Sequence, residues 1–269
     1  MTVGDQKQAD SSHADIGIVC ALRIELAAFL DRCDRVKKYT GGEFVFRGGR
    51  CGEIRVAVVE SGIGFARARR ATQALIEAHS PTWIIASGFS GALMPAMKVG
   101  DIVVANSLVD THGQKLVVDL KMTANPEKGL YVGRIITTDE LIRTVQKKQE
   151  LAERYGAAAV DLESLAVAQV CREEKKRFLT VRTISDDMLS DLPPEVISLV
   201  GATGSMRFGA VIGAIWERPA SIKKLWELRE SAHVAADHLA TFLGGVVAQL
   251  HEACTLRIHP AEPPVAQSE

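Results

Sequence analysis

The chain has 269 residues, of which 47% are hydrophobic and 24% are charged, and its formal net charge at pH 7 is −1. A chain of this length can bury one large core, and single α/β domains of this size are common. The near-neutral balance argues against nucleic acid or an anionic membrane surface as a partner, because both attract strongly basic proteins.

The cysteines and the two chain ends bear on the cellular environment. The five cysteines form no CxxC pair and show no metal-ligand spacing, which favours free thiols in a reducing cytoplasm and predicts no metal site. The first residues lack the apolar stretch of a signal peptide, and no run reaches the ~18 apolar residues of a membrane helix. We therefore expect a cytoplasmic protein without a membrane span. Residues 1–14 and 254–269 are polar or proline-rich and are expected to be disordered, which leaves one domain over residues 15–250.

Short β-rich runs alternate with helical stretches along most of the chain. The expected strands are Asp15–Cys20, Glu43–Arg47, Ile54–Val59, Thr82–Ser87, Asp101–Ala105, Val132–Ile136, Ala157–Val160 and Phe178–Ile184. The expected helices among them are Leu22–Leu30, Ala66–Ala78 and Leu162–Glu174. Apolar runs bounded by Gly, Pro or Asp are typical of a sheet that is covered on both faces. The alternation predicts an α/β fold, a three-layer α/β/α sandwich with a central mixed, largely parallel sheet.

The last part of the chain, Pro193–Leu250, contains no convincing strand. Pro193 and Pro194 open a short helix, and Phe208–Trp216 is an apolar helical run. Pro219 then begins a long amphipathic helix that extends to about Leu250.

Two glycine-containing turns follow expected strands. The segment SGIG at 61–64 begins with Ser61 and precedes a helix, whose first N–H groups can bind an oxygen or an anion, although a tight strand-to-helix turn explains the same letters. It lacks the third glycine and the later acidic residue of a dinucleotide fingerprint, so no such cofactor is expected. The second turn, with Gly88, Phe89 and Ser90, lies at the carboxyl end of Thr82–Ser87, where open α/β sheets bind ligands. A purely structural turn is the alternative here as well.

Two carboxylates stand at the junction of a strand and a helix. Asp161 and Glu163 flank Leu162, and acids at this place can complement the helix dipole. The helix continues as the almost wholly apolar LAVAQV, so its start is expected to face the interior. A buried Glu163 then needs a partner, which is either a protein donor or a ligand hydroxyl.

Three more acids lie near expected strand ends. Asp186 follows the strand Phe178–Ile184 and is well placed for chemistry, whereas Asp187 is expected to cap the following turn. Glu25 lies on the helix after the first strand and, taken alone, would be interpreted as a surface glutamate.

Five blocks of this sequence together resemble one family. IGIVCALRIEL is similar to the opening of methylthioadenosine/S-adenosylhomocysteine nucleosidases, in which a strand leads to the helix with the catalytic glutamate. SGIGFARAR, SGFSGALMPAMKVGDIVVA, AVDLESLAVAQV and FLTVRTISD follow in the order and spacing of that family, so the resemblance covers about residues 16–186. The segment Pro193–Leu250 looks more like a hopanoid-associated relative, which also has a proline pair followed by a helical tail.

The resemblance implies cleavage of the N-glycosidic bond of a purine nucleoside. It implies that Glu163 binds the ribose 2′- and 3′-hydroxyls, with Leu162 packed under the sugar. Asp186 would protonate the purine at N7, and Glu25 with Arg182 would hold the attacking water. An oxocarbenium-like transition state requires a carboxylate near the sugar and an acid at the leaving group, while a base on the opposite face activates water. The substrate-binding set is completed by Ser61, Gly88, Phe89, Ser90 and Leu141.

Several departures from the family pattern affect the expected reaction. Ala86 stands where phosphorylases of the family carry a phosphate-binding arginine, and their early glycine–arginine motif is missing, which favours hydrolysis. Phe89 occupies a place usually held by a small hydroxyl residue. Asp110–Gly129 lacks the aromatic pattern of the base pocket, and Leu141 stands where an aromatic ring usually stacks on the base.

Three functions remain open at this stage. The first is a nucleosidase for an adenosine derivative with a modified 5′ position. The second is a phosphorylase, including one for a lipophilic adenosyl conjugate whose path Phe208–Trp216 and Trp226 would line, although packing on the core or on a second subunit also explains those residues. The third is a nucleoside-binding protein without turnover, against which the three carboxylates argue. We expect a homodimer, because family members complete the 5′ pocket with residues from a neighbour.

Overall fold

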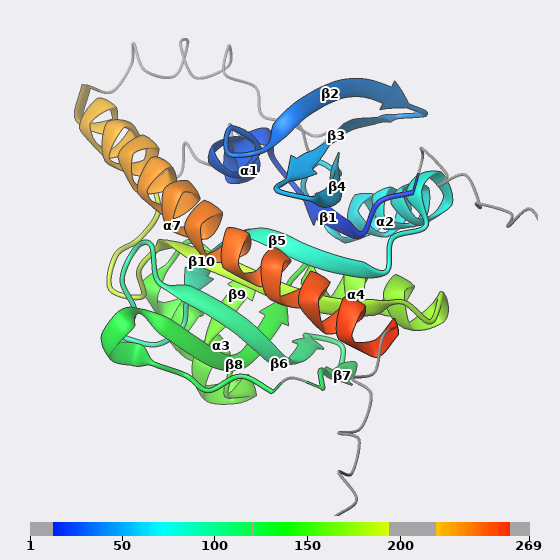
Figure 1. Cartoon of the computed structure of the whole chain (residues 1–269). Helices are drawn as coiled ribbons and strands as arrows, with labels where there is room; N and C mark the ends of the chain where they lie inside the picture. Colours follow the sequence, from blue (N-terminus) through cyan, green and yellow to red (C-terminus); the bar gives the residue numbers. More distant parts are fainter. Residues whose placement is uncertain (1–12, 120, 194–218, 259–269) are drawn as a thin grey trace, which may run out of the picture.

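The computed structural model describes residues 13–119, 121–193 and 219–258 (Figure 1). The strands are β1 (Ile16–Cys20), β2 (Asp34–Gly41), β3 (Phe44–Cys51), β4 (Ile54–Glu60), β5 (Trp83–Ala92), β6 (Ile102–Asp110), β7 (Lys115–Val117), β8 (Leu130–Thr137), β9 (Ala159–Asp161) and β10 (Arg177–Asp186). The helices are α1 (Arg23–Leu30), α2 (Phe65–His79), α3 (Val145–Tyr155), α4 (Ser164–Glu173) and α7 (Pro219–Ile258), with a short 3-10 helix, η1 (Pro126–Lys128).

The strands form one mixed sheet in the order β10-β6-β8-β9-β5-β1-β4-β3-β2. Strand β5 also pairs with β10, so that β5, β10, β6, β8 and β9 close into a ring, from which β1, β4, β3 and β2 continue the sheet. The neighbours β4, β1, β5 and β10 run parallel to one another, whereas β2, β3 and β4 form an antiparallel meander. The α/β fold with a mixed sheet is confirmed, and the closure of the ring is an addition to the expectation.

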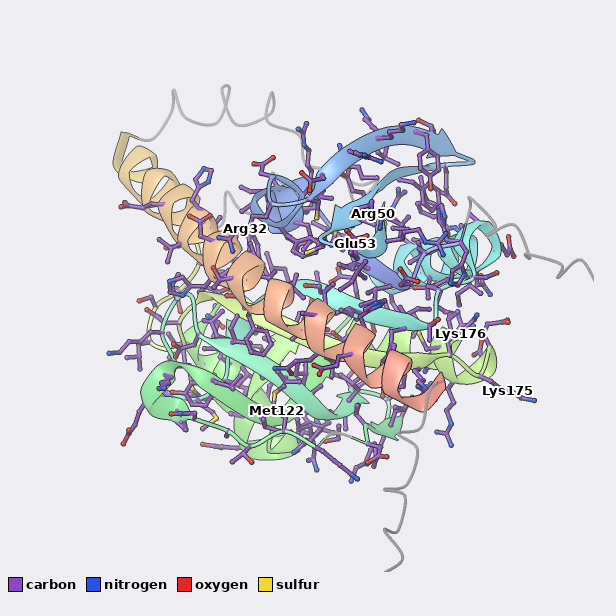
Figure 2. All side chains as sticks on the ribbon, in the orientation of Figure 1. Arg32, Arg50, Glu53, Met122, Lys175 and Lys176 are labelled. Atoms are coloured by element: carbon purple, nitrogen blue, oxygen red, sulfur yellow. The ribbon has the colours of Figure 1, made fainter. Side chains whose placement is uncertain are left out.

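Helices cover the sheet beside β1 on both faces. Alternate residues of β1 point to opposite sides: Ile16 and Ile18 pack with α1 and α7, whereas Val19 packs with α2 and α4. In Figure 1, α7 crosses the sheet over β5 and β10. Arg32, which follows α1, donates to Thr241 Oγ1 of α7 over 2.9 Å and links these two helices at the surface (Figure 2).

The helix α2 shows why these segments fold as they do. Its buried residues recur at helical spacing, and its charged residues all occupy other positions. These buried residues are Ala68, Ala71, Thr72, Leu75 and Ile76. The helix ends at Ser80, which adopts a left-handed conformation with φ 42°. As the crossover between β4 and β5, α2 packs against β1, β4 and α4.

Three observed elements were not expected from the sequence. Strand β2 is exposed along nearly all of its length and carries no alternating apolar side, so its pairing with β3 is invisible in the hydrophobic pattern. Strand β7 has three residues. Helix α3 is rich in charge, but its end signals are present: Thr144 Oγ1 accepts the N–H of Lys147 over 3.3 Å, and Gly156 ends the helix with φ 58°.

The described structure extends a few residues past the expected domain limits at both ends. Ala14 is buried and its N–H donates to His79 O over 3.1 Å, and α7 continues through Ile258 rather than ending near Leu250. Pro194 and the apolar run Phe208–Trp216 lie outside the described residues. The single domain stays a prediction, which the packing of α7 on α1 and β10 supports. No helix in the described part of the chain is long and apolar enough to cross a membrane.

Candidate active site

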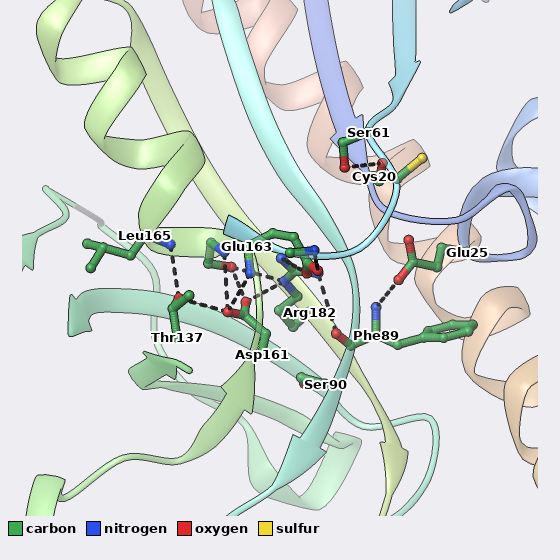
Figure 3. A network of polar contacts seen from close by, with 12 residues as sticks. Cys20, Glu25, Ser61, Phe89, Ser90, Thr137, Asp161, Glu163, Leu165 and Arg182 are labelled. Atoms are coloured by element: carbon green, nitrogen blue, oxygen red, sulfur yellow. Dashed lines mark hydrogen bonds and ion pairs between the residues drawn. The ribbon is translucent and has the colours of Figure 1, made fainter. Parts of the chain in front are cut away.

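The residues singled out from the sequence meet at one edge of the sheet. Because β4, β1, β5 and β10 are parallel, the segments that follow their carboxyl ends lie together. Glu25 follows β1, the SGIG turn follows β4, and Asp186 ends β10. Figure 3 shows Arg182 beside Glu163, with Glu25 close to Phe89 on the neighbouring strand.

Glu25 is buried, so its interpretation as a surface residue is wrong. Its Oε2 accepts the N–H of Leu22 over 2.8 Å, and its Oε1 accepts the N–H of Phe89 over 2.9 Å. The first contact caps α1, and the second ties the helix to β5. Burial raises the pKa of Glu25. Nearby Arg182 and the backbone N–H donors act to lower this pKa, but they offset the effect of burial only in part.

Gly88 allows two charged groups to lie against the main chain of β5. A Cβ at this position would lie 2.6 Å from Glu25 Oε1 and 2.7 Å from Arg182 Nη1, and the φ of Gly88 is +152°. A side chain at position 88 would therefore displace Glu25 and Arg182. Gly88, Phe89 and Ser90 lie within β5 rather than in a turn after it, so the expected turn is wrong, and Gly88 has a steric role in the site.

Arg182 is the central cation of the cluster and is 1% exposed. Its Nε lies 2.8 Å from Asp161 Oδ2, its Nη2 lies 3.5 Å from Glu163 Oε2, and its Nη1 donates to Phe89 O over 3.4 Å (Figure 3). Burial acts to lower the pKa of Arg182, but the surrounding carboxylates outweigh it and the net shift is upward.

Asp161 anchors Arg182, a role that the sequence did not indicate. Besides the ion pair, its Oδ1 accepts the Thr137 hydroxyl over 2.8 Å and the Ser164 N–H over 3.2 Å, and its Oδ2 accepts the Ser164 hydroxyl. These protein donors occupy both oxygens of Asp161. Its place two residues before Glu163 was visible in the sequence, but its partners come from β8 and β10.

Glu163 is buried with fewer protein partners. Its Oε1 accepts the N–H of Gly64 over 2.9 Å, so the SGIG turn uses that donor on a protein carboxylate rather than on a ligand. Its Oε2 has only the distant contact with Arg182 at 3.5 Å. Burial raises the pKa of Glu163 to about 7; Arg182 acts to lower it, and the neighbouring Asp161 and Glu25 raise it further.

Asp186 lies at the end of β10 with its side chain 15% exposed. Its Oδ1 accepts the Ser185 hydroxyl over 2.8 Å, and its Oδ2 lies 2.6 Å from Nζ of Lys148 on α3. The sequence did not indicate Lys148, because it stands in the charged stretch QKKQE and resembles a surface lysine. Asp187 caps the following turn as expected, since its Oδ1 accepts the N–H of Leu189 over 2.9 Å.

The other predicted binding residues lie around this cluster. The Ser61 hydroxyl is buried and lies 3.1 Å from Cys20 O and 2.6 Å from Gly62 O, which gives it a local structural role. Ser90 is buried in β5, with its Oγ 3.5 Å from Thr183 O. Leu162 and Leu141 are both half-buried, Leu162 between the two acids and Leu141 between β8 and α3. Their roles toward a sugar and a base stay predictions.

The residues expected to bear on an anion site are engaged within the protein. Ala86 packs in the core beside α2. Of the arginines after the SGIG turn, Arg69 pairs with Glu173 and Arg70 with Glu43, while Arg67 Nε donates to Ser61 O over 2.8 Å. Within residues 13–119, 121–193 and 219–258, no three His, Cys, Asp or Glu side chains are grouped as a metal site requires.

A cavity of about 620 Å³ lies at the opposite end of the same strands. Trp83 and Arg177, which begin β5 and β10, line it together with Lys176 and Met122 (Figure 2). This cavity is therefore separate from the carboxylate cluster.

Comparisons with known proteins agree with this architecture. The 5′-methylthioadenosine/S-adenosylhomocysteine nucleosidase of Staphylococcus haemolyticus is 26% identical over 195 residues, which are 64% of this chain and 86% of the relative. The protein of the same name from Shewanella pealeana is 28% identical over 203 residues, 66% of this chain and 88% of the relative. The solved structure of futalosine hydrolase of Helicobacter pylori shares the fold with a TM-score of 0.64 at 20% identity, over 87% of this chain and 97% of that chain.

The match to a family model covers most of the chain. The model of the phosphorylase superfamily matches residues 15–127 and 115–215, which include every element of the carboxylate cluster. The chain therefore belongs to the phosphorylase superfamily.

Proposed function

We propose that the protein is an enzyme that hydrolyses the N-glycosidic bond of a purine nucleoside, of the adenosine type with a modified 5′ position. The observation that carries the proposal is the buried pair of Glu25 and Glu163, both of which lie close to the buried Arg182 (Figure 3). Relatives named as methylthioadenosine/S-adenosylhomocysteine nucleosidases support the reaction and the substrate class.

Glu163 binds the ribose. Its Oε1 accepts one backbone N–H, and its Oε2 has only the 3.5 Å contact with Arg182, so lone pairs remain for the 2′- and 3′-hydroxyls. Asp161 is unsuited to this task because protein donors already occupy both of its oxygens. A carboxylate at the sugar hydroxyls also stabilises the positive charge that develops in the transition state.

Glu25 activates the attacking water. Each of its oxygens accepts one backbone N–H and keeps a lone pair for a water proton. Burial raises its pKa, which makes it a stronger base than an exposed glutamate. The water oxygen bonds to C1′ as the C1′–N9 bond breaks, and the water proton passes to Glu25.

Asp186 serves the leaving base. The electron pair of the broken bond enters the purine ring, and Asp186 delivers a proton to N7, so the base departs neutral. Leu162 packs under the sugar. Gly88, Phe89 and Ser90 are the part of the central strand β5 that lies beside the water.

Hydrolysis is favoured over phosphorolysis by the same geometry. Phosphorolysis requires cationic side chains for the phosphate, yet Ala86 is in the core, and Arg69 and Arg70 pair with surface glutamates. The phosphorylase reaction and binding without turnover are the other outcomes of the test below.

The experiment is incubation with adenosine, inosine or methylthioadenosine, with and without phosphate. We expect free base and free sugar from methylthioadenosine at the same rate in both buffers. Ribose 1-phosphate-type products that appear only with phosphate would establish phosphorolysis. Bound but intact nucleoside would establish a binding protein.

A further inference from the structure

A lysine occupies a core position on an otherwise exposed helix. Lys148 is fully buried, whereas its neighbours Lys147 and Gln149 on α3 are exposed. It lies one turn before Leu151, on the face by which α3 packs on the protein. Burying an ammonium group is costly unless acceptors satisfy it, so this position needs a specific explanation.

The acceptors of Lys148 are all at the end of β10. Its Nζ lies 2.6 Å from Asp186 Oδ2 and also donates to the carbonyl of Asp187. The second oxygen of Asp186 accepts the Ser185 hydroxyl over 2.8 Å, so both oxygens are oriented. Across the main chain, Gly91 leaves space for the carboxyl group of Asp186, since a Cβ at that position would lie 3.0 Å from Asp186 Oδ2.

Further contacts hold α3 against the segment that follows Asp186. The N–H of Val145 donates to Asp191 Oδ1 over 2.7 Å, and Leu192 N donates to Arg143 O over 2.8 Å. Arg143 Nη1 also donates to Leu192 O over 3.2 Å. The start of α3 and the end of β10 thus form one framework, and the Lys148–Asp186 ion pair is its buried part.

We propose that Lys148 is a positioning residue that acts through Asp186 and supplies the proton which Asp186 delivers to the leaving base. The inference rests on the proposed function, because it assigns a role in the cleavage step. In the ion pair Asp186 is a carboxylate and has no proton to donate. The Lys148 ammonium that contacts it has one.

The proton balance of the step is complete. As C1′–N9 breaks, one proton of the Lys148 ammonium moves to the carboxylate of the ion-paired Asp186, and Asp186 passes that proton on to N7 of the base. The base leaves neutral, and the pair is left as a neutral amine beside a carboxylate. The partly exposed Asp186 then takes a proton from solvent and returns it to Lys148.

The charges around the pair favour an ammonium at position 148. Asp186 and the Asp187 carbonyl face it from β10 and the residue after it. Asp191, which follows β10, accepts the N–H of Val145, and Arg143, which precedes α3, donates to Leu192 O. The groups that face Nζ are thus a carboxylate and a carbonyl oxygen, both of which accept a hydrogen bond from an ammonium donor.

The test compares K148M with K147M, the same substitution at the exposed neighbour, on methylthioadenosine and on a nitrophenyl riboside. Nitrophenolate leaves without protonation, so only the first substrate needs the proton. We expect K148M to cleave methylthioadenosine about 10²-fold more slowly than the wild type at pH 8, which is the usual worth of a positioned acid. At pH 5 the loss of rate relative to the wild type should be smaller. K148M should cleave the nitrophenyl riboside at the wild-type rate. K147M should show the wild-type pH profile for methylthioadenosine cleavage.

A second variant separates proton supply from orientation. In K148R the guanidinium keeps the ion pair but cannot release a proton, so the slow cleavage of methylthioadenosine should persist. K148R also serves if K148M does not fold. Recovery of the wild-type rate in K148R, or an unchanged pH profile in K148M, would overturn the inference while the proposed function stands. A wild-type protein that cleaves neither substrate would overturn both.

Discussion

Replacing Gly88 by alanine tests whether function depends on the close approach of Glu25 and Arg182 to β5. The new Cβ would lie 2.6 Å from Glu25 Oε1 and 2.7 Å from Arg182 Nη1, whereas ordinary contacts begin near 3.4 Å. Both groups must therefore move by somewhat less than about 1 Å. A displacement of this size costs roughly 10²-fold in rate when it affects groups that act on the substrate. Neither group can yield easily, because Glu25 holds two backbone N–H groups and Arg182 is paired with Asp161.

The assay for Gly88→Ala is the kcat for methylthioadenosine together with urea unfolding. We expect kcat to fall about 10²-fold and the free energy of unfolding to fall by about 1–3 kcal/mol, the usual cost of crowding a packed interior. Gly42→Ala is the control: its φ is +58°, but no atom lies within 4 Å of the added Cβ. It should lose about 1–2 kcal/mol of stability and keep full activity. A Gly88→Ala protein with wild-type kcat would refute the reasoning.

Three other predictions follow from the same cluster and its surroundings. Asp186→Asn should slow methylthioadenosine cleavage by about 10²–10⁴-fold and nitrophenyl riboside cleavage far less; equal losses on both substrates would assign Asp186 to binding or folding. Because burial raises the pKa of Glu163 from 4.5 to about 7, the folded protein binds more protons than the unfolded chain in that range, and its stability falls as the pH rises through it. Glu163→Gln should flatten this fall between pH 5 and pH 8 in urea titrations, and an unaltered pH dependence would argue against a shifted Glu163. Light scattering should give twice the 29.1 kDa chain mass at micromolar concentration, and a monomeric mass would count against the homodimer.

The sequence by itself determined those helices and strands whose buried residues form a continuous run or a regular spacing. Strand β1 is buried at every residue and was recognisable as a continuous apolar run, and α2 has apolar residues at helical spacing. Asp187 was correctly predicted to cap a turn, because that contact spans only two residues. The sequence also predicted that Glu163 lies at the start of a buried helix, because the residues after it are almost all apolar and leave the helix no polar face.

The tertiary structure alone decided which polar groups meet. Asp161 is occupied by Arg182 and Thr137, and Asp186 by Lys148, through contacts that join residues 21 to 38 positions apart. No periodic pattern encodes such partners, because a polar residue looks the same in sequence whether it faces water or a buried ion. Strand β5 pairs with β10 as well as with β1, and this additional pairing closes the ring and brings Arg182 next to Gly88. It depends on long-range register in the same way. Periodicity tells which side of an element is buried, whereas the partner on that side is set by how the elements pack.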